Sequence, residues 1–151
     1  MSDPDETRPR RTPTVDRMEI LFVAGFGPIS ADPAASRAFW VDGLGIQVEA
    51  DGDYLHTGEL DGTRHFAVWP LAQAAESCFG EPAWPADVPV PQAWVEFDVA
   101  DVAAAAAELE SAGHRLLHGP RTMPWKQILA RLLSPEGLLV GVAYTPWMRE
   151  G

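Results

Sequence analysis

A strand–helix–three-strand pattern occurs twice in this chain of 151 residues, and no other feature limits its fold so strongly. Asp32 and Asp101 each precede a predicted helix and are 69 residues apart, while Gly45 and Gly113 each follow that helix and are 68 residues apart. An aspartate at such a position accepts the free amide protons of the first helical turn. One copy alone cannot bury both faces of a four-stranded sheet. The repeat therefore predicts two modules that pack together into one larger curved sheet.

The first module is predicted to span residues 18–80. Its opening strand at 18–26 is apolar and ends before Pro28. Pro33 fits the first position of the helix, where its missing N–H costs nothing, and the helix ends near Gly43. Three strands are predicted to follow, at 46–50, 53–57 and 64–69, and then a short helix at 71–79.

A proline-rich segment at 81–91 is predicted to connect the modules. The second module, 92–147, opens on a strand at 92–99 whose apolar and polar side chains alternate. An alanine-rich helix follows, which Gly113 can close in a left-handed conformation. Three more strands are predicted at 114–118, 126–133 and 138–145. The predicted fold class is α+β, with two βαβββ modules forming a cupped mixed sheet and helices on the outside.

Charge and hydrophobicity exclude several classes of protein. Residues 1–17 carry four acids, four arginines and three prolines, a composition that predicts a disordered tail. The net charge of -11 then falls on residues 18–151, where an acidic surface repels nucleic acid and anionic lipid and attracts cations. No apolar run is long enough to span a membrane and no secretory signal is present, so a cytoplasmic protein is predicted. Cys78 is the only cysteine, which excludes an internal disulfide and predicts a small buried hydrophobe.

Several spaced motifs accompany the repeat. In chain order they are Asp32 with Ser36, Ala38-Phe39-Trp40, Leu44-Gly45, Pro124-Trp125, Arg131 and Ser134-Pro135-Glu136-Gly137. In this order they resemble the vicinal oxygen chelate superfamily of glyoxalases, bleomycin-resistance proteins and extradiol dioxygenases, over residues 18–147. The resemblance implies a homodimer, in some members with modules exchanged between chains, and the connector at 81–91 permits either arrangement. It does not choose an activity, because this cupped sheet hosts lyases, dioxygenases, epimerases, thiol transferases and drug-sequestering proteins.

The resemblance implies a test for a metal site. Enzymes of this superfamily usually hold a divalent ion through His and Glu side chains near the first and last strands of each module. Seven residues before the capping aspartates stand Gly25 and Trp94, and four residues after the glycine of the SPEG turn stands Gly141. The counterpart of Gly141 falls on the strand at 64–69, where only His65 could coordinate. Divalent metals want three or four nitrogen, sulfur or oxygen ligands, so the sequence predicts no metal and no cofactor.

The histidines and one arginine invite other interpretations. His56 and His65 lie on neighbouring predicted strands and could approach each other, whereas His114 and His118 lie four residues apart on one face of one strand. A local structural role is preferred for all four, since isolated histidines mostly satisfy nearby hydrogen bonds. Arg131 is expected on a solvated face, although the resemblance implies that it orients its hairpin by pairing with a carboxylate.

Aromatic and charged side chains are predicted to take the place of the metal. Trp94 and Glu96 share one face of their strand, and Trp69 is expected on the facing strand of the first module. Glycines at two of the usual ligand positions would open room. These features predict a pocket for an aromatic or cationic organic molecule, held by stacking and cation–π contacts. The predicted ligand-binding residues are Gly25, His65, Trp69, Trp94, Glu96 and Gly141.

The alternative role of a tryptophan is to fill the core. For Trp94 both roles stay open, because the opposite face of its strand, with Val95, Phe97 and Val99, already supplies apolar side chains. Trp40 and Trp147 are expected in the core.

Three functions follow from these observations. The first is a metal-free protein that binds or sequesters a small organic ligand. The second is a lyase, dioxygenase or isomerase, which would use unusual metal ligands such as His56, His65 and Glu96, or else His65 or Glu96 as a general base with a pKa near the working pH. The third is an interaction module without a small ligand.

Overall fold

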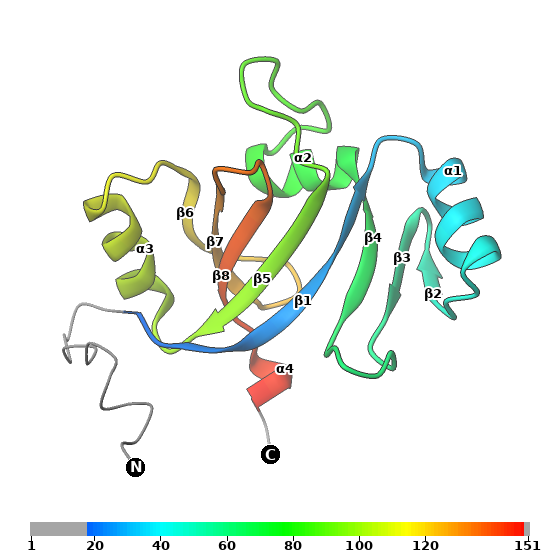
Figure 1. The fold of residues 1–151 in the computed structure, drawn as a ribbon. Helices are drawn as coiled ribbons and strands as arrows, with labels where there is room; N and C mark the ends of the chain where they lie inside the picture. Colours follow the sequence, from blue (N-terminus) through cyan, green and yellow to red (C-terminus); the bar gives the residue numbers. More distant parts are fainter. Residues whose placement is uncertain (1–17, 150–151) are drawn as a thin grey trace, which may run out of the picture.

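The computed structural model describes residues 18–149, and the tail predicted at 1–17 lies outside them. A single curved sheet of eight strands has the order β2-β3-β4-β1-β5-β8-β7-β6 (Figure 1). This order is symmetrical about its centre, because the first four strands come from one module and the last four from the other. The α+β fold class and the cupped mixed sheet of two βαβββ modules are therefore confirmed.

The two modules repeat the same elements. The first contributes β1 (Ile20–Ser30), α1 (Pro33–Arg37) with its π-helical continuation η2 (Ala38–Gly43), β2 (Glu49–Asp51), β3 (Tyr54–Thr57) and β4 (Phe66–Pro70). The second contributes β5 (Ala93–Val99), α3 (Val102–Ser111), β6 (Leu116–Thr122), β7 (Ile128–Leu133) and β8 (Leu139–Tyr144). A helix also follows the last strand of each module, namely α2 (Leu71–Phe79) and α4 (Pro146–Arg149).

The modules join edge to edge at the centre of the sheet. There β1 pairs antiparallel with β5, so that Val23 lies opposite Phe97 and Phe26 opposite Val95. Each central strand also pairs in parallel with the last strand of its own module, β1 with β4 and β5 with β8. The concave surface is therefore built by both halves in equal part.

Both predicted helix caps form. Oδ1 of Asp32 accepts a hydrogen bond from the amide of Ala35 at 3.1 Å, and Oδ1 of Asp101 accepts one from the amide of Ala104 at 3.0 Å. Gly113 has a φ of +94°, the left-handed conformation that the predicted end of α3 requires. The sequence signals that mark the repeat are therefore the contacts that start and end its helices.

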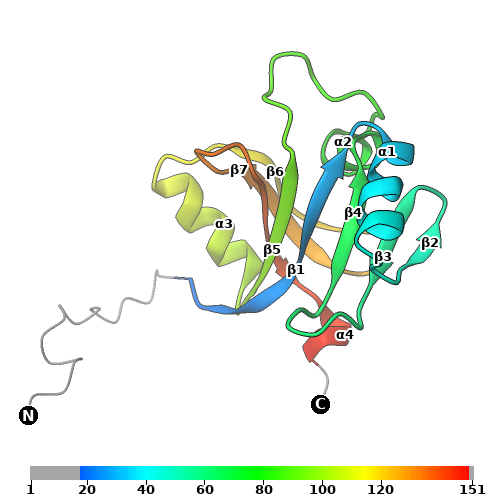
Figure 2. The same ribbon diagram turned by 45° about the vertical axis from the view of Figure 1, so that its right-hand side comes forward.

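Helices cover the two halves of the outer face, and the other two helices, α2 and α4, lie on the inner side. The pair α1–η2 covers the buried Leu55, Phe66 and Val68 of the first half, and α3 packs its alanines against the second half (Figures 1 and 2). In contrast, α2 packs Ala74 and Cys78 against the inner face, where it closes one end of the cup. None of the helices in residues 18–149 is both long and apolar enough to cross a membrane.

Candidate functional site

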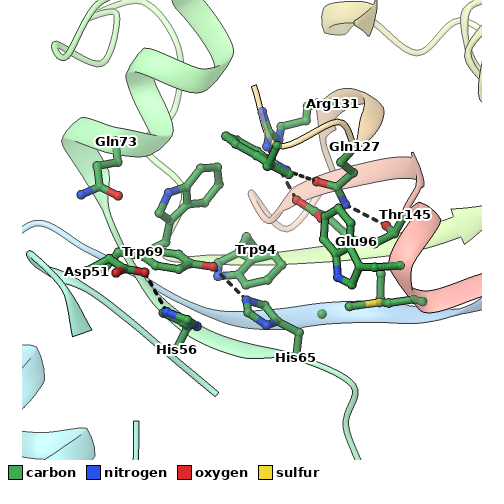
Figure 3. A pocket seen from close by; sticks show the side chains of 16 residues that line it. Asp51, His56, His65, Trp69, Gln73, Trp94, Glu96, Gln127, Arg131 and Thr145 are labelled. Atoms are coloured by element: carbon green, nitrogen blue, oxygen red, sulfur yellow. Dashed lines mark hydrogen bonds and ion pairs between the residues drawn. The ribbon is translucent and has the colours of Figure 1, made fainter. Parts of the chain in front are cut away.

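A cavity of about 520 Å³ lies within the curve of the sheet, a size typical of small-molecule sites. Sixteen residues line it, from both modules, from α2 and from α4 (Figure 3). Five of the six predicted ligand-binding residues are among them, namely Gly25, His65, Trp69, Trp94 and Glu96. The sixth, Gly141, lies beneath the wall and does not line the cavity.

Trp94 belongs to the core and to the cavity wall at once. It is only 6% exposed, and its indole N–H donates to the carbonyl of Ala67 at 3.1 Å. The opposite face of its strand does not replace it as core, because Val95 and Phe97 are only half-buried and Val99 alone is fully buried beneath α3. The two roles that the sequence left open are therefore compatible.

The glycines at the usual ligand positions do not create empty space. A Cβ at Gly25 would lie 2.9 Å from Cη2 of Trp94, and a Cβ at Gly141 would lie 2.9 Å from Cγ of Glu96. Contacts this short would force a neighbour to move, so the side chains of Trp94 and Glu96 already occupy the space above the two glycines. The predicted open room at both positions is wrong for this steric reason.

The first module supplies a wall of imidazole and phenol groups. The hydroxyl of Tyr54 and Nε2 of His65 are 2.8 Å apart, and Nε2 of His56 lies 2.9 Å from Oδ2 of Asp51. The two histidine rings approach to 5.8 Å between centroids. Burial, and then the charge of Glu96, raises the pKa of Tyr54, whereas burial, and then His56, lowers the pKa of His65. Both groups are therefore uncharged at neutral pH.

The second module supplies a hydrogen-bonded wall centred on Gln127. Its amide nitrogen donates to Oε1 of Glu96 at 3.0 Å and to Oγ1 of Thr145 at 2.9 Å, while its oxygen accepts from the indole N–H of Trp125 at 2.8 Å. Thr145 in turn donates to Asp98 at 2.6 Å. These contacts satisfy both ends of the amide, so the orientation of Gln127 is fixed and Glu96 is held in place.

Arg131 lies beside Glu96 in this wall and not on the solvated face expected from the sequence. It is 1% exposed, because β7 is a central strand of the second half and not a free hairpin arm. Its Nη1 donates to Oγ of Ser77 at 2.6 Å, and its Nη2 lies 3.7 Å from Oε2 of Glu96. The carboxylate partner that the resemblance implied is therefore Glu96.

Two tryptophans at the cavity wall were missed by the sequence analysis. Trp125 and Trp147 line the cavity yet are 47% and 54% exposed, so the expected core position of Trp147 is wrong. Its helix α4 turns back over the cavity because the fully buried carboxylate of Asp98 accepts from Nε of Arg149 at 2.9 Å. The available signal was a buried acid on β5, which requires a cationic partner elsewhere in the chain.

The other two histidines lie away from the cavity. His114 precedes β6 and is exposed, so the strand predicted from residue 114 starts two residues later and contains only His118 of the two histidines. Nδ1 of His118 bonds to the carbonyl oxygen of Gly119 at 2.8 Å, and its Nε2 lies 3.4 Å from Nη1 of Arg131. Burial, against the hydrogen bond to Gly119 and helped by the charge of Arg131, lowers the pKa of His118 to about 4. These contacts support a local structural role for His118.

The donors at this site do not fit a divalent metal ion. In residues 18–149 no three His, Cys, Asp or Glu side chains come together as a ligand set. His56 and His65 use their Nε2 atoms toward Asp51 and Tyr54, and Glu96 is held by Gln127 on the other wall. The indole of Trp94 fills the space above Gly25. The chemistry of the wall is therefore aromatic stacking and hydrogen bonding.

A cupped sheet of two βαβββ modules around a cavity defines a glyoxalase-like protein. The family model described as the Glyoxalase/Bleomycin resistance protein/Dioxygenase superfamily matches residues 27–142, and the chain belongs to this superfamily. A search of curated proteins finds no match.

Solved structures agree on the fold at low sequence identity. A superfamily member from Vibrio splendidus 12B01 is 16% identical with a TM-score of 0.50, covering 84% of this chain and 98% of its own. A methylmalonyl-CoA epimerase variant from Streptomyces coelicolor with bound 2-nitronate-propionyl-CoA is 18% identical with a TM-score of 0.52, covering 88% and 100%. The Mn(II)-bound glyoxalase from Novosphingobium aromaticivorans is 17% identical with a TM-score of 0.52, covering 89% of this chain and 41% of its own.

Proposed function

We propose that this protein is a metal-free receptor that binds a planar aromatic organic molecule in the cup of its sheet. The observation that carries the proposal is the replacement of metal-ligand positions by a packed aromatic wall. Trp94 lies over Gly25 and meets Trp69 edge to face at 6.0 Å between ring centroids. Aromatic side chains at the wall of a cavity of this size favour flat ligands.

The exposed tryptophans provide the test, because they can be removed without damage to the core. Trp147→Ala is expected to weaken binding of 2-naphthol or N-methylquinolinium at least about tenfold, which is roughly 1.4 kcal/mol, with a melting temperature close to that of the wild type. Calorimetry measures the affinity and a thermal shift measures the stability. Phe39→Ala is the matched control, since Phe39 is 57% exposed and lies outside the cavity.

Two results would reject the receptor. One is the absence of binding by both the neutral and the cationic probe up to millimolar concentration. The other is a stoichiometric divalent metal in the purified protein, measured by elemental analysis. A cation that binds and a neutral probe that does not would favour a cationic ligand.

The second candidate is an enzyme that uses His65 as a general base. The lowered pKa of His65 favours it, because the imidazole is neutral and able to accept a proton at physiological pH. Against it, Tyr54 already engages Nε2 of His65 at 2.8 Å. If the wild type converts a ligand found in the binding test and His65→Gln does not, the result supports an enzyme that uses His65.

We also propose that the chain forms a homodimer, as the resemblance implies. The apolar side chains of Ile20, Val23 and Phe26 are exposed on β1, and this strand runs between α1 and α3 (Figure 1). Exposed apolar patches of this kind mark protein interfaces. Light scattering is expected to give twice the mass of the chain, and Phe26→Ser to shift it toward the monomer. A wild-type monomer at micromolar concentration would reject the dimer.

A further inference from the structure

Arg131 and Glu96 form a widely spaced pair of opposite charges at the cavity wall. Nη2 of Arg131 lies 3.7 Å from Oε2 of Glu96, and their side chains are only 2% and 13% exposed. A charge-assisted hydrogen bond is shorter, about 2.7–2.9 Å. Because buried charges cost free energy unless they are hydrogen-bonded, this pair is incompletely satisfied.

Two further atoms of this pair, Nη1 of Arg131 and Oε1 of Glu96, already have partners. Nη1 of Arg131 donates to Ser77, and Oε1 of Glu96 accepts from Gln127. Among residues 18–149, every side-chain nitrogen or oxygen atom that is fully buried makes a hydrogen bond. Nη2 of Arg131 and Oε2 of Glu96 make no ordinary hydrogen bond with the described residues, so each atom keeps some exposed surface, and both side chains line the cavity.

The opposite signs of the two atoms decide which ligand group fits them. A carboxylate that approached Arg131 would be repelled by Glu96, and an amidinium that approached Glu96 would be repelled by Arg131. A neutral group with one acceptor and one donor side by side satisfies both atoms. In an amide the oxygen and nitrogen are about 2.3 Å apart from standard bond lengths, so one amide can reach two partners a few ångströms apart.

We propose that the ligand carries an uncharged amide or lactam on an aromatic ring, with its C=O accepting from Arg131 and its N–H donating to Glu96. The proposal rests on the proposed receptor function and specifies the class of its ligand. The guanidinium of Arg131 lies 5.0 Å from the centroid of Trp69, so the amide position is continuous with the aromatic wall. Figure 3 shows Glu96, Gln127 and Arg131 gathered on one side of the pocket, with Trp94 between them and His65.

Three flat probes of the same shape test the head group directly. Calorimetric titrations of the wild-type protein with 2-naphthamide, 2-naphthoate and 2-naphthamidine compare a neutral, an anionic and a cationic group on one ring. The expected result is that 2-naphthamide binds at least tenfold more tightly than either ion. Glu96→Gln is expected to reduce this preference at least fivefold, because its side-chain amide can turn a donor toward the ligand N–H. Glu110→Gln, which removes the same charge from the exposed surface of α3, is expected to leave the preference unchanged.

The wild-type comparison decides the proposal even where Glu96→Gln is unstable. Equal or tighter binding of the naphthoate or the naphthamidine overturns the amide proposal and leaves the receptor function intact. Failure of all three probes overturns the amide proposal, and the receptor function falls only when 2-naphthol and N-methylquinolinium also fail to bind.

Discussion

The two modules carry side chains of very different size at equivalent positions of the repeat. Seven residues before its helix cap, the first module has Gly25 and the second has Trp94, and the indole of the second lies directly over the glycine of the first. A symmetrical pair of tryptophans could not occupy this space, because even a single Cβ at Gly25 would come within 2.9 Å of the ring. The repeat produces the curved sheet, and the difference between Gly25 and Trp94 allows the cavity wall to pack closely.

The two walls of the cavity also differ in charge. In the first module Tyr54 and His65 are uncharged, because burial moves the pKa of each away from neutrality, and the carboxylate of Asp51 is paired with His56. In the second module the oppositely charged Arg131 and Glu96 line the cavity beside the fixed amide of Gln127. A ligand therefore meets two chemically different ends, and we expect it to bind in one orientation although the fold around it is nearly symmetrical.

The largest loss of stability is expected when this asymmetry is removed by Trp94→Ala. Removal of a buried tryptophan leaves a cavity and is expected to lower the free energy of unfolding by about 3–5 kcal/mol. The orphaned carbonyl of Ala67 adds to the loss, since Trp94 donates its hydrogen bond. Urea denaturation measures the change. Trp147→Ala, at a site that is 54% exposed, is the control with an expected loss below about 0.5 kcal/mol, and a loss below about 1 kcal/mol for Trp94→Ala would show that its ring is not core.

Much of the scaffold could be predicted because its signals are local. Asp32 and Asp101 cap their own helices, and the count of seven residues back from each cap reaches Gly25 and Trp94 on adjacent central strands. Alternation along β5 also places Trp94 and Glu96 on the cavity face. These relationships depend on periodicity and on one pairing of strands, which the repeat itself suggests.

The rest depends on contacts between distant segments. The position of Trp147 follows from the attachment of α4 through Arg149 to Asp98, 51 residues earlier in the chain. The burial of Arg131 follows from the central place of β7 and from Ser77 on α2. Alternation indicates the face of a side chain but not which neighbour occupies the space above it. The sequence therefore could not show that other side chains fill the space at Gly25 and Gly141.

A smaller effect is expected from Gly25→Ala. The new Cβ would contact Trp94 and the carbonyl of His65, which lies 3.1 Å away, so overpacking is expected to cost about 1–3 kcal/mol. In a Trp94→Phe background the ring no longer reaches this position, and the cost is expected to fall by at least about 0.5 kcal/mol. A double-mutant cycle by urea denaturation measures this coupling. Equal costs in both backgrounds would show that the backbone of His65, and not the indole, requires the glycine.

The smallest expected effect is on the pH dependence of stability. The residues to compare are His118, at the edge of the second module, and His65 in the first. The pKa of His118 falls from its ordinary 6.5 to about 4 on folding, so between these values the unfolded chain binds the proton and the folded chain does not. Stability is therefore lost as the pH falls through this window, and the loss ends below about 4. Because His118 is partly exposed, solvent screening reduces the contribution to the order of 1 kcal/mol.

His118→Gln is expected to flatten this part of the pH profile, measured as the free energy of unfolding between pH 4.5 and 7. His65→Gln is expected to act in the same direction, since burial also lowers the pKa of His65. His114→Gln is the control, because His114 is exposed and lies outside the cavity. A difference between wild type and His118→Gln that stayed constant across this range would mean that His118 does not change its affinity for protons on folding, and that the proximity of Arg131 at 3.4 Å has no electrostatic consequence.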